Sequence, residues 1–139
     1  MADTPITVSK LTTYGSGAVS VGSSVRPEVP AFYTGSYDND AAYHTLSVSA
    51  SGKARLSYCI NNEANQDVVA TLYGSFSFDG VVGDDDVFAI DSTGITATAS
   101  GGKIYDTCSD PFPFFIVRTK AAAAGDAGEV NVYVAIMAY

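Results

Sequence analysis

The sequence predicts an all-β protein, an antiparallel β-sandwich of jelly-roll type with an extended N-terminal arm. One observation is the C-terminal segment 129–139, where apolar residues occupy every second position and therefore one face of a strand. Another is that short alternating segments recur along the chain with Gly- or Asn-rich turns between them, the pattern of sandwiches and jelly rolls. A closing strand this apolar must be paired and covered, either in its own sheet or by a neighbouring molecule.

The individual strands are expected where residues alternate in polarity or where β-branched and aromatic residues gather. In chain order these segments are 6–11, 18–21, 31–34, 45–50, 53–60, 68–74, 87–90, 94–99, 103–105, 114–120 and 129–138. Turn signals such as Ser51-Gly52, Asn61-Asn62 and Gly101-Gly102 separate them. No segment has a convincing helical period, and 121–128 is expected to be a loop.

A change of composition near residue 30 predicts two parts, an arm at 1–30 and a sandwich domain at 31–139. The arm is rich in Gly, Pro and Ser and poor in bulky apolar residues. One interpretation is a loose terminus. The other is an arm that adds a strand to a neighbouring subunit, which its two short β-prone stretches favour. The side chains that would make this contact are Ile6, Val8, Leu11, Val19 and Val21.

Composition excludes several classes of partner. The 139 residues are 47% hydrophobic and only 16% charged, which suits a folded domain whose surface is partly covered. The formal net charge is −8, so neither nucleic acid nor anionic lipid is expected as a partner. No apolar run approaches the roughly 20 residues that span a bilayer. Residues 1–5 lack the features of a secretory signal, which predicts synthesis in a cytoplasm.

The two cysteines, Cys59 and Cys108, leave two interpretations open. They are either buried thiols that act as small hydrophobic residues or partners in a disulfide between strands. Cytoplasmic synthesis disfavours the disulfide. Zinc is not expected, because two Cys and the single His44 supply too few ligands.

An acidic cluster offers the one candidate metal site. Asp79, Asp84, Asp85 and Asp86 follow one another closely, and Ca²⁺ takes six to eight oxygen ligands. The spacing is not that of an EF-hand, and the favoured interpretation is a solvated loop that opposes aggregation between strands. No cofactor other than this candidate calcium is expected.

Catalysis is not expected. A single His and the absence of a Gly-x-Ser-x-Gly motif leave a nucleophile without a visible base. There is also no Trp, although nine Tyr could replace it in stacking on sugars. Tyr33, Tyr37 and Tyr43 are either an exposed patch or ordinary strand tyrosines. Phe112, in the stretch 110–115, is either a core residue or a contact with another subunit.

Residues 45–139 resemble small β-sandwich proteins of tailed-virus virions. The elements that carry the resemblance are a polar turn, a strand ending in Gly-Ser, a Pro-aromatic stretch that opens a strand with an Arg, and a Gly turn before a Val/Tyr strand. In this chain they are Asn61-Asn62, the segment 71–75, Pro113-Phe114 with Val117-Arg118, and the segment 128–133. The resemblance implies a capsid decoration or similar accessory protein, located in the virion.

Three functions follow as hypotheses, none of them enzymatic. The first is a virion structural protein that forms a homo-oligomer, a trimer by preference, and binds a major capsid or other shell protein. Its contacts would come from the arm and from Phe112, Tyr133 and Tyr139. The second is a surface- or glycan-binding module, with or without Ca²⁺ in the acidic loop. The third is a filament or tube subunit that polymerises by strand addition.

Overall fold

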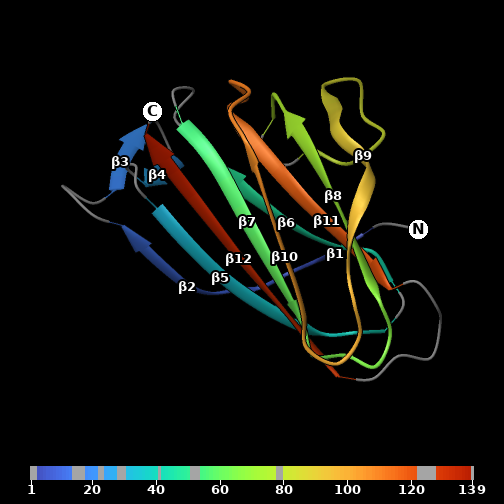
Figure 1. Cartoon of the computed structure of the whole chain (residues 1–139). Coiled ribbons are helices and arrows are strands. Elements are labelled where there is room, and N and C mark those ends of the chain that lie inside the picture. The colour runs from blue at the N-terminus through green and yellow to red at the C-terminus, as the bar shows by residue number, and fades with distance from the viewer. Residues whose placement is uncertain are drawn as a thin grey trace.

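The structure, a computed structural model, confirms the all-β sandwich. It describes residues 3–13, 18–21, 24–27, 31–40, 42–50, 54–77, 80–121 and 128–138 (Figure 1). Its strands are β1 Thr4–Pro5, β2 Val8–Thr13, β3 Ala18–Val21, β4 Ser24–Pro27, β5 Ala31–Asp38, β6 His44–Ser49, β7 Ala54–Asn62, β8 Val68–Ser75, β9 Val87–Ala97, β10 Gly102–Cys108, β11 Phe114–Ala121 and β12 Glu129–Ala138. Within this part of the chain, no helix is long and apolar enough to cross a membrane.

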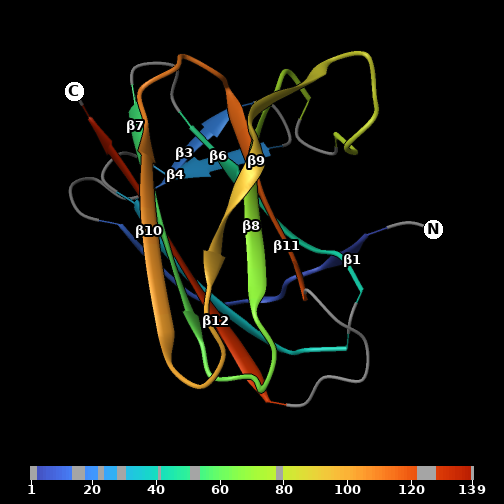
Figure 2. The same ribbon diagram turned by 45° about the vertical axis from the view of Figure 1, so that its right-hand side comes forward.

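The strands β5 to β12 form a jelly roll. One sheet has the order β6-β11-β8-β9, and the other has the order β10-β7-β12-β5. All of these neighbours pair antiparallel, and consecutive strands of the chain mostly lie in different sheets. This order is that of two Greek keys folded into a double sheet. Figure 2 shows the two layers, with β10 and β12 in one and β8 and β11 in the other.

The alternation seen in the sequence builds the core between the sheets. In β12, Val130, Val132, Val134 and Ile136 are all buried, while Tyr133 and Met137 are exposed. β6 and β8 alternate in the same way. Each Å² of apolar area buried on the two inner faces stabilises the fold by about 25 cal/mol. This burial gives each strand a fixed register, since a slip by one residue would turn its apolar side chains outward.

Two strands that the sequence separates are one strand in the structure. Segments 87–90 and 94–99 were expected to be distinct, but β9 runs continuously with register shifts against β8. Gly94 has a positive φ of 83°, and its amide donates to Asp91 Oδ1 at 3.2 Å. These features form a bulge that bends the strand without ending it.

The N-terminal segment pairs with its own chain, whereas the sequence analysis left open a loose terminus or an arm that adds a strand to a neighbouring subunit. β1 pairs in parallel with β6, and β2 pairs antiparallel with β5, so residues 3–13 extend both sheets of their own chain. Ile6, between the two strands, is a core residue with 5% exposure. A Cβ at Gly35 would lie 2.8 Å from Ile6 Cγ2, so glycine is what lets the segment cross closely. Apolar Ile6 finds its burial within the chain and is unavailable to a neighbour.

The second half of the expected arm forms a separate hairpin. β3 and β4 pair with each other, with Val19 opposite Arg26, and they make a two-stranded sheet apart from the sandwich. The side chains of Val19 and Val21 lie outside the described residues. Their expected contact with a neighbouring subunit stays a prediction.

Candidate binding surface

The candidate functional site is a groove on the outer face of the β10-β7-β12-β5 sheet. Strand register places Tyr105 of β10 opposite Cys59 of β7, and Cys59 opposite Tyr133 of β12. In the next row on the same face, Ser57 lies opposite Ala135. Tyrosines from two strands therefore flank a floor of small side chains from the strand between them. We call this site the tyrosine groove, defined by Tyr105, Tyr133, Cys59, Ser57, Ala135 and Phe32.

The tyrosine groove is open and aromatic. It encloses about 230 Å³, and the exposed fractions of Tyr105 and Tyr133 are 77% and 42%. Because neighbouring strands lie about 4.8 Å apart, the backbones that carry the two rings are separated by about 9.5 Å. That separation leaves room for one flat ring between them. Among the described residues, neither tyrosine has a ring or cation contact, so the exposed part of each ring is open to a ligand.

A row of polar side chains borders the groove on the same face. Asn61 of β7 lies opposite both Lys103 of β10 and Asn131 of β12, and Asn131 lies opposite Ser36 of β5. Asn61 Oδ1 is buried and has no hydrogen-bond partner among the described residues. Leaving a buried acceptor unpaired costs about 1–3 kcal/mol of stability. Aromatic faces and amide groups thus lie side by side.

The structure decides between the two interpretations of the cysteines. Both thiols are free. Cys59 is half-buried on the outer face, whereas Cys108 is buried and belongs to the core. The two side chains therefore point to opposite faces of one sheet, where no disulfide can join them. Burial raises the pKa of the Cys108 thiol, which makes it a slow nucleophile.

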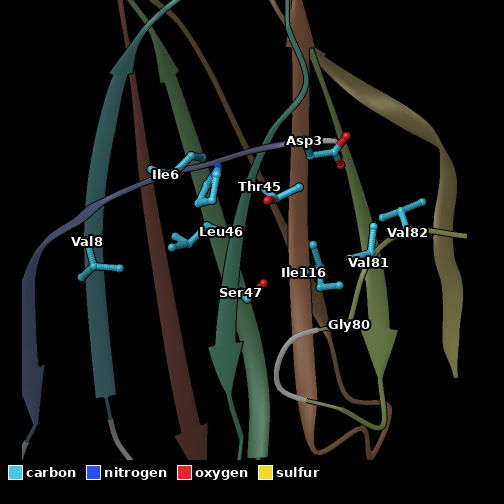
Figure 3. Close-up of a pocket in the computed structure, with 11 residues that line it drawn as sticks. Asp3, Ile6, Val8, Thr45, Leu46, Ser47, Gly80, Val81, Val82 and Ile116 are labelled. Atoms are coloured by element: carbon cyan, nitrogen blue, oxygen red, sulfur yellow. The ribbon is translucent and has the colours of Figure 1, made fainter. Parts of the chain in front are cut away.

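A second pocket lies where the N-terminal segment crosses β6 (Figure 3). It encloses about 330 Å³ between Ile6, Val8, Thr45, Ile116 and the Val81-Val82 loop. Asp3, at its rim, is already held by Arg118, whose Nε donates to Asp3 Oδ2 at 2.8 Å. The walls of this pocket are mostly aliphatic, and its carboxylate, Asp3, is already paired with Arg118. The pocket therefore has few groups that could select a polar ligand.

The acidic loop does not gather its carboxylates. Asp84 and Asp85 are exposed, and Asp84 Oδ2 accepts from the backbone of Val81 at 3.0 Å, which closes a turn. Among the described residues, no three His, Cys, Asp or Glu side chains are close enough to hold a metal ion. Asp79 lies outside the described residues, and a calcium site that includes it stays a prediction.

The other residues singled out from the sequence are dispersed. Tyr33 is buried, Tyr37 stacks on His44 at 3.8 Å, and Tyr43 is exposed, so the three tyrosines form no common patch. Phe112 packs against the core, which agrees with its interpretation as a core residue. Val8 and Leu11 of β2 are exposed. Tyr139 lies outside the described residues.

Sequence reasoning named Tyr133 but missed Tyr105 and Cys59 as its neighbours. The alternation of 103–105 places Tyr105 on the face opposite Ile104, which would have indicated an outward ring. What the sequence does not contain is the order β10-β7-β12. That order alone brings residues 59, 105 and 133 into one row.

No protein-family model and no curated protein matches this chain. Among solved structures, it is similar to PliG of Aeromonas hydrophila, a periplasmic inhibitor of g-type lysozyme, with 10% identity over 98% of this chain and 96% of that one, at a TM-score of 0.47. It is also similar to the K3 cleaved adhesin domain of Lys-gingipain from Porphyromonas gingivalis (16% identity, 76% and 74% covered, TM-score 0.42) and to a CBM4 structure (9%, 93% and 85%, 0.42). These similarities concern the β-sandwich layout alone.

Proposed function

We propose that this protein is a non-catalytic binding module and that its ligand is a neutral oligosaccharide held in the tyrosine groove. The observation that carries the proposal is the pair of exposed rings, Tyr105 and Tyr133, on either side of the small Cys59 side chain. Sugar rings present C–H faces that stack on aromatic rings, and a flat ring fits the gap. This is the glycan-binding hypothesis of the sequence analysis in its version without calcium.

The polar row makes a sugar a better ligand than an apolar peptide or lipid. Asn61 and Asn131 supply amide donors and acceptors beside the rings, which is how binding sites fix the orientation of hydroxyl groups. A purely apolar ligand would bury these amides without partners, at a cost of about 1–3 kcal/mol for each. The mixture of aromatic and amide groups therefore favours a ligand that has both apolar faces and hydroxyls.

The test is a screen of the protein on an immobilised glycan array, followed by calorimetry with the best neutral oligosaccharide. Tyr105→Ala and Tyr133→Ala should each weaken binding by about tenfold or more, since stacking on one aromatic ring contributes about 0.5–1.5 kcal/mol beyond its area burial. Tyr43→Ala is the control, because Tyr43 is an exposed tyrosine in the turn before β6, away from the groove. Equal losses in all three variants, or no neutral glycan bound, would reject the proposal.

A second candidate function, virion assembly, has one observation in its favour. Phe76 and Phe88 are 60% and 47% exposed and pack edge to face, with Phe112 beside them. Exposed aromatic clusters of this kind suit protein interfaces. We propose on this basis that the phenylalanines would contact another copy or a shell protein, with the virion as location.

Light scattering of the purified chain, with and without chelator, tests the assembly function. It predicts a discrete closed oligomer, a trimer by preference, that Phe88→Ser dissociates. Open polymers would favour the filament hypothesis instead. A monomer at all concentrations would leave only assembly on a pre-existing shell. A chelator effect on mass or on Tm would support bound calcium, which stabilises only the native state.

A further inference from the structure

A third pocket lies on the outer face of the other sheet and differs in chemistry from the tyrosine groove. It encloses about 380 Å³ between Tyr43, Thr71, Thr93, Arg118 and Lys120. These residues come from the turn before β6 and from β8, β9 and β11. Because the two sheets pack face to face, this pocket and the tyrosine groove open on opposite sides of the molecule.

Two cations converge on one aromatic ring in this pocket. The guanidinium of Arg118 lies 3.6 Å from the centroid of the Tyr43 ring, and Lys120 Nζ lies 4.6 Å from the same centroid. In a chain with a net charge of −8 and seven Lys and Arg in all, that convergence concentrates positive charge. Stacking on an aromatic ring holds a cation in place without neutralising it.

The two cations are in different states. Arg118 is bound to Asp3 through two nitrogens, Nε to Oδ2 at 2.8 Å and Nη2 to Oδ1 at 3.1 Å. Its charge is therefore balanced within the protein. Lys120 is exposed and has no ion-pair partner among the described residues. Lys120 thus supplies the free positive charge of the pocket, on a strand that the Arg118–Asp3 pair helps to fix.

The hydroxyls of the pocket are arranged as hydrogen-bond acceptors. Thr71 Oγ1 donates its proton to the Arg118 carbonyl at 3.3 Å, and Thr93 Oγ1 donates to Asp91 Oδ1 at 3.0 Å. A hydroxyl has one proton and two acceptor lone pairs. With both protons used inside the protein, Thr71 and Thr93 can only accept from a ligand. The pocket therefore matches a ligand that donates O–H bonds and also carries a negative charge.

We propose that this pocket binds a sugar acid, with the carboxylate on Lys120 and the hydroxyls donating to Thr71 and Thr93. A carboxylate alone leaves the two threonine acceptors unused, and a neutral sugar leaves the lysine unused. A sugar acid uses both. This site is independent of the tyrosine groove and goes beyond the proposed function, since it adds a second ligand of opposite character on the other face.

The test is a titration of the ¹⁵N-labelled full chain with D-glucuronate, followed through the amide signals of Tyr43, Thr71, Thr93 and Lys120. We expect saturable shifts in the millimolar range that D-glucose and N-acetylglutamate do not produce. Lys120→Gln should weaken glucuronate binding about tenfold, as for loss of a charge-assisted hydrogen bond. Lys10→Gln is the matched control, because Lys10 is an exposed lysine of β2 in the opposite sheet.

Three results would overturn the proposal. They are an absence of saturable shifts with glucuronate, equal shifts with glucose or N-acetylglutamate, and equal loss in the two lysine variants. Thr93→Val provides a second variant should Lys120→Gln fail to fold, and its binding of glucuronate should also fall. A signal with N-acetylglutamate as strong as with glucuronate would assign the pocket to acidic peptides instead. None of these results bears on neutral glycans in the tyrosine groove, so the two proposals fail separately.

Discussion

Aromatic side chains serve different ends in two regions of this molecule. At the β8–β9 end of the sandwich, Phe112 lies against Phe115, Phe76 and Phe88, at ring separations of 6.1, 5.6 and 6.3 Å. On the outer face of the β10-β7-β12-β5 sheet, Tyr105 and Tyr133 touch no other ring among the described residues and stand over Cys59. Rings that pack on each other stabilise the fold, whereas rings left open in a row can stabilise a complex.

The difference follows from what lies beneath each group of rings. Beneath Phe112 is Gly74, where a Cβ would lie 2.3 Å from the Phe112 ring. The missing side chain lets the ring sink onto the strand and join the core. Beneath the tyrosines are Cys59, Ser57 and Ala135, whose side chains are small but fill the pleat. The side chains of Tyr105 and Tyr133 stay 77% and 42% exposed.

The largest expected effect is a loss of unfolding free energy when a ring of the phenylalanine cluster is removed. Phe112→Ala should lower the free energy of unfolding by about 2–4 kcal/mol, below the range for a fully buried Phe because Phe112 is half-buried. Chemical denaturation measures this change. A loss below about 0.5 kcal/mol, the level of an ordinary surface substitution, would mean that the phenylalanines do not support the fold.

An alkaline titration reports on Tyr37, a tyrosine that packs against the core. Burial raises the pKa of Tyr37 from 10.0 to about 12. A proton held more tightly in the folded state stabilises it fully below pH 10, and that contribution is lost as the pH rises through 12. The loss should reach about 2 kcal/mol. Thermal unfolding at pH values between about 9 and 12 measures this loss of stability.

One variant shows whether this alkaline loss belongs to Tyr37. Tyr37→Phe has no phenol to ionise, so its stability should fall less steeply with pH than that of the parent protein. Identical slopes for the parent protein and Tyr37→Phe would contradict the assignment.

The Asp3–Arg118 pair distinguishes the two outer faces. Asp3→Asn should destabilise the protein by about 1–3 kcal/mol, because the pair is largely buried and Arg118 would keep its charge without a counter-ion. It should also strengthen glucuronate binding, because Arg118 lines that pocket and its charge would no longer be balanced by Asp3. Neutral glycan binding on the opposite face should not change. Calorimetry with both ligands on the same variant makes the comparison, and a parallel loss of both would show that the faces are coupled.

The smallest expected effect on stability is at the tyrosine groove itself. Tyr105→Ala should change the free energy of unfolding by less than about 0.5 kcal/mol, because 77% of the side chain is exposed. The same variant should lose most of its affinity for the neutral glycan. Denaturation and calorimetry on one preparation test the pair of outcomes. A large loss of stability would place Tyr105 with the packing rings and not with the binding rings.

Much of the fold was predictable because the strands of a sandwich alternate between buried apolar residues and exposed polar residues, and this alternation is visible in the sequence. The strand expected at 129–138 matches β12, and its buried valines are those that the alternation indicated. The N-terminal segment was not predictable in the same way. The glycine and proline content suggested an extended arm, loose or reaching a neighbouring subunit, but Ile6 and its close approach to Gly35 fix residues 3–13 to the chain's own core.

The candidate site was less accessible from the sequence, because it depends on strand order. Tyr105 and Tyr133 are far apart in the chain and become neighbours only through Cys59 on the strand between them. Thr71 and Thr93 are also brought together only by the fold. Their hydroxyls donate to the Arg118 carbonyl and to Asp91. Long-range pairing of this kind leaves no local signal in the residues themselves.

The most direct test of the central claim uses Cys59 as a reporter at the floor of the tyrosine groove. We would measure its rate of alkylation by N-ethylmaleimide, by mass spectrometry, with and without the neutral glycan selected on the array. Cys108 is buried and serves as the internal reference. A glycan between Tyr105 and Tyr133 should slow the alkylation of Cys59 in proportion to the occupied fraction and leave Cys108 unaffected. An unchanged rate at saturating glycan would show that the sugar binds elsewhere and would contradict the account.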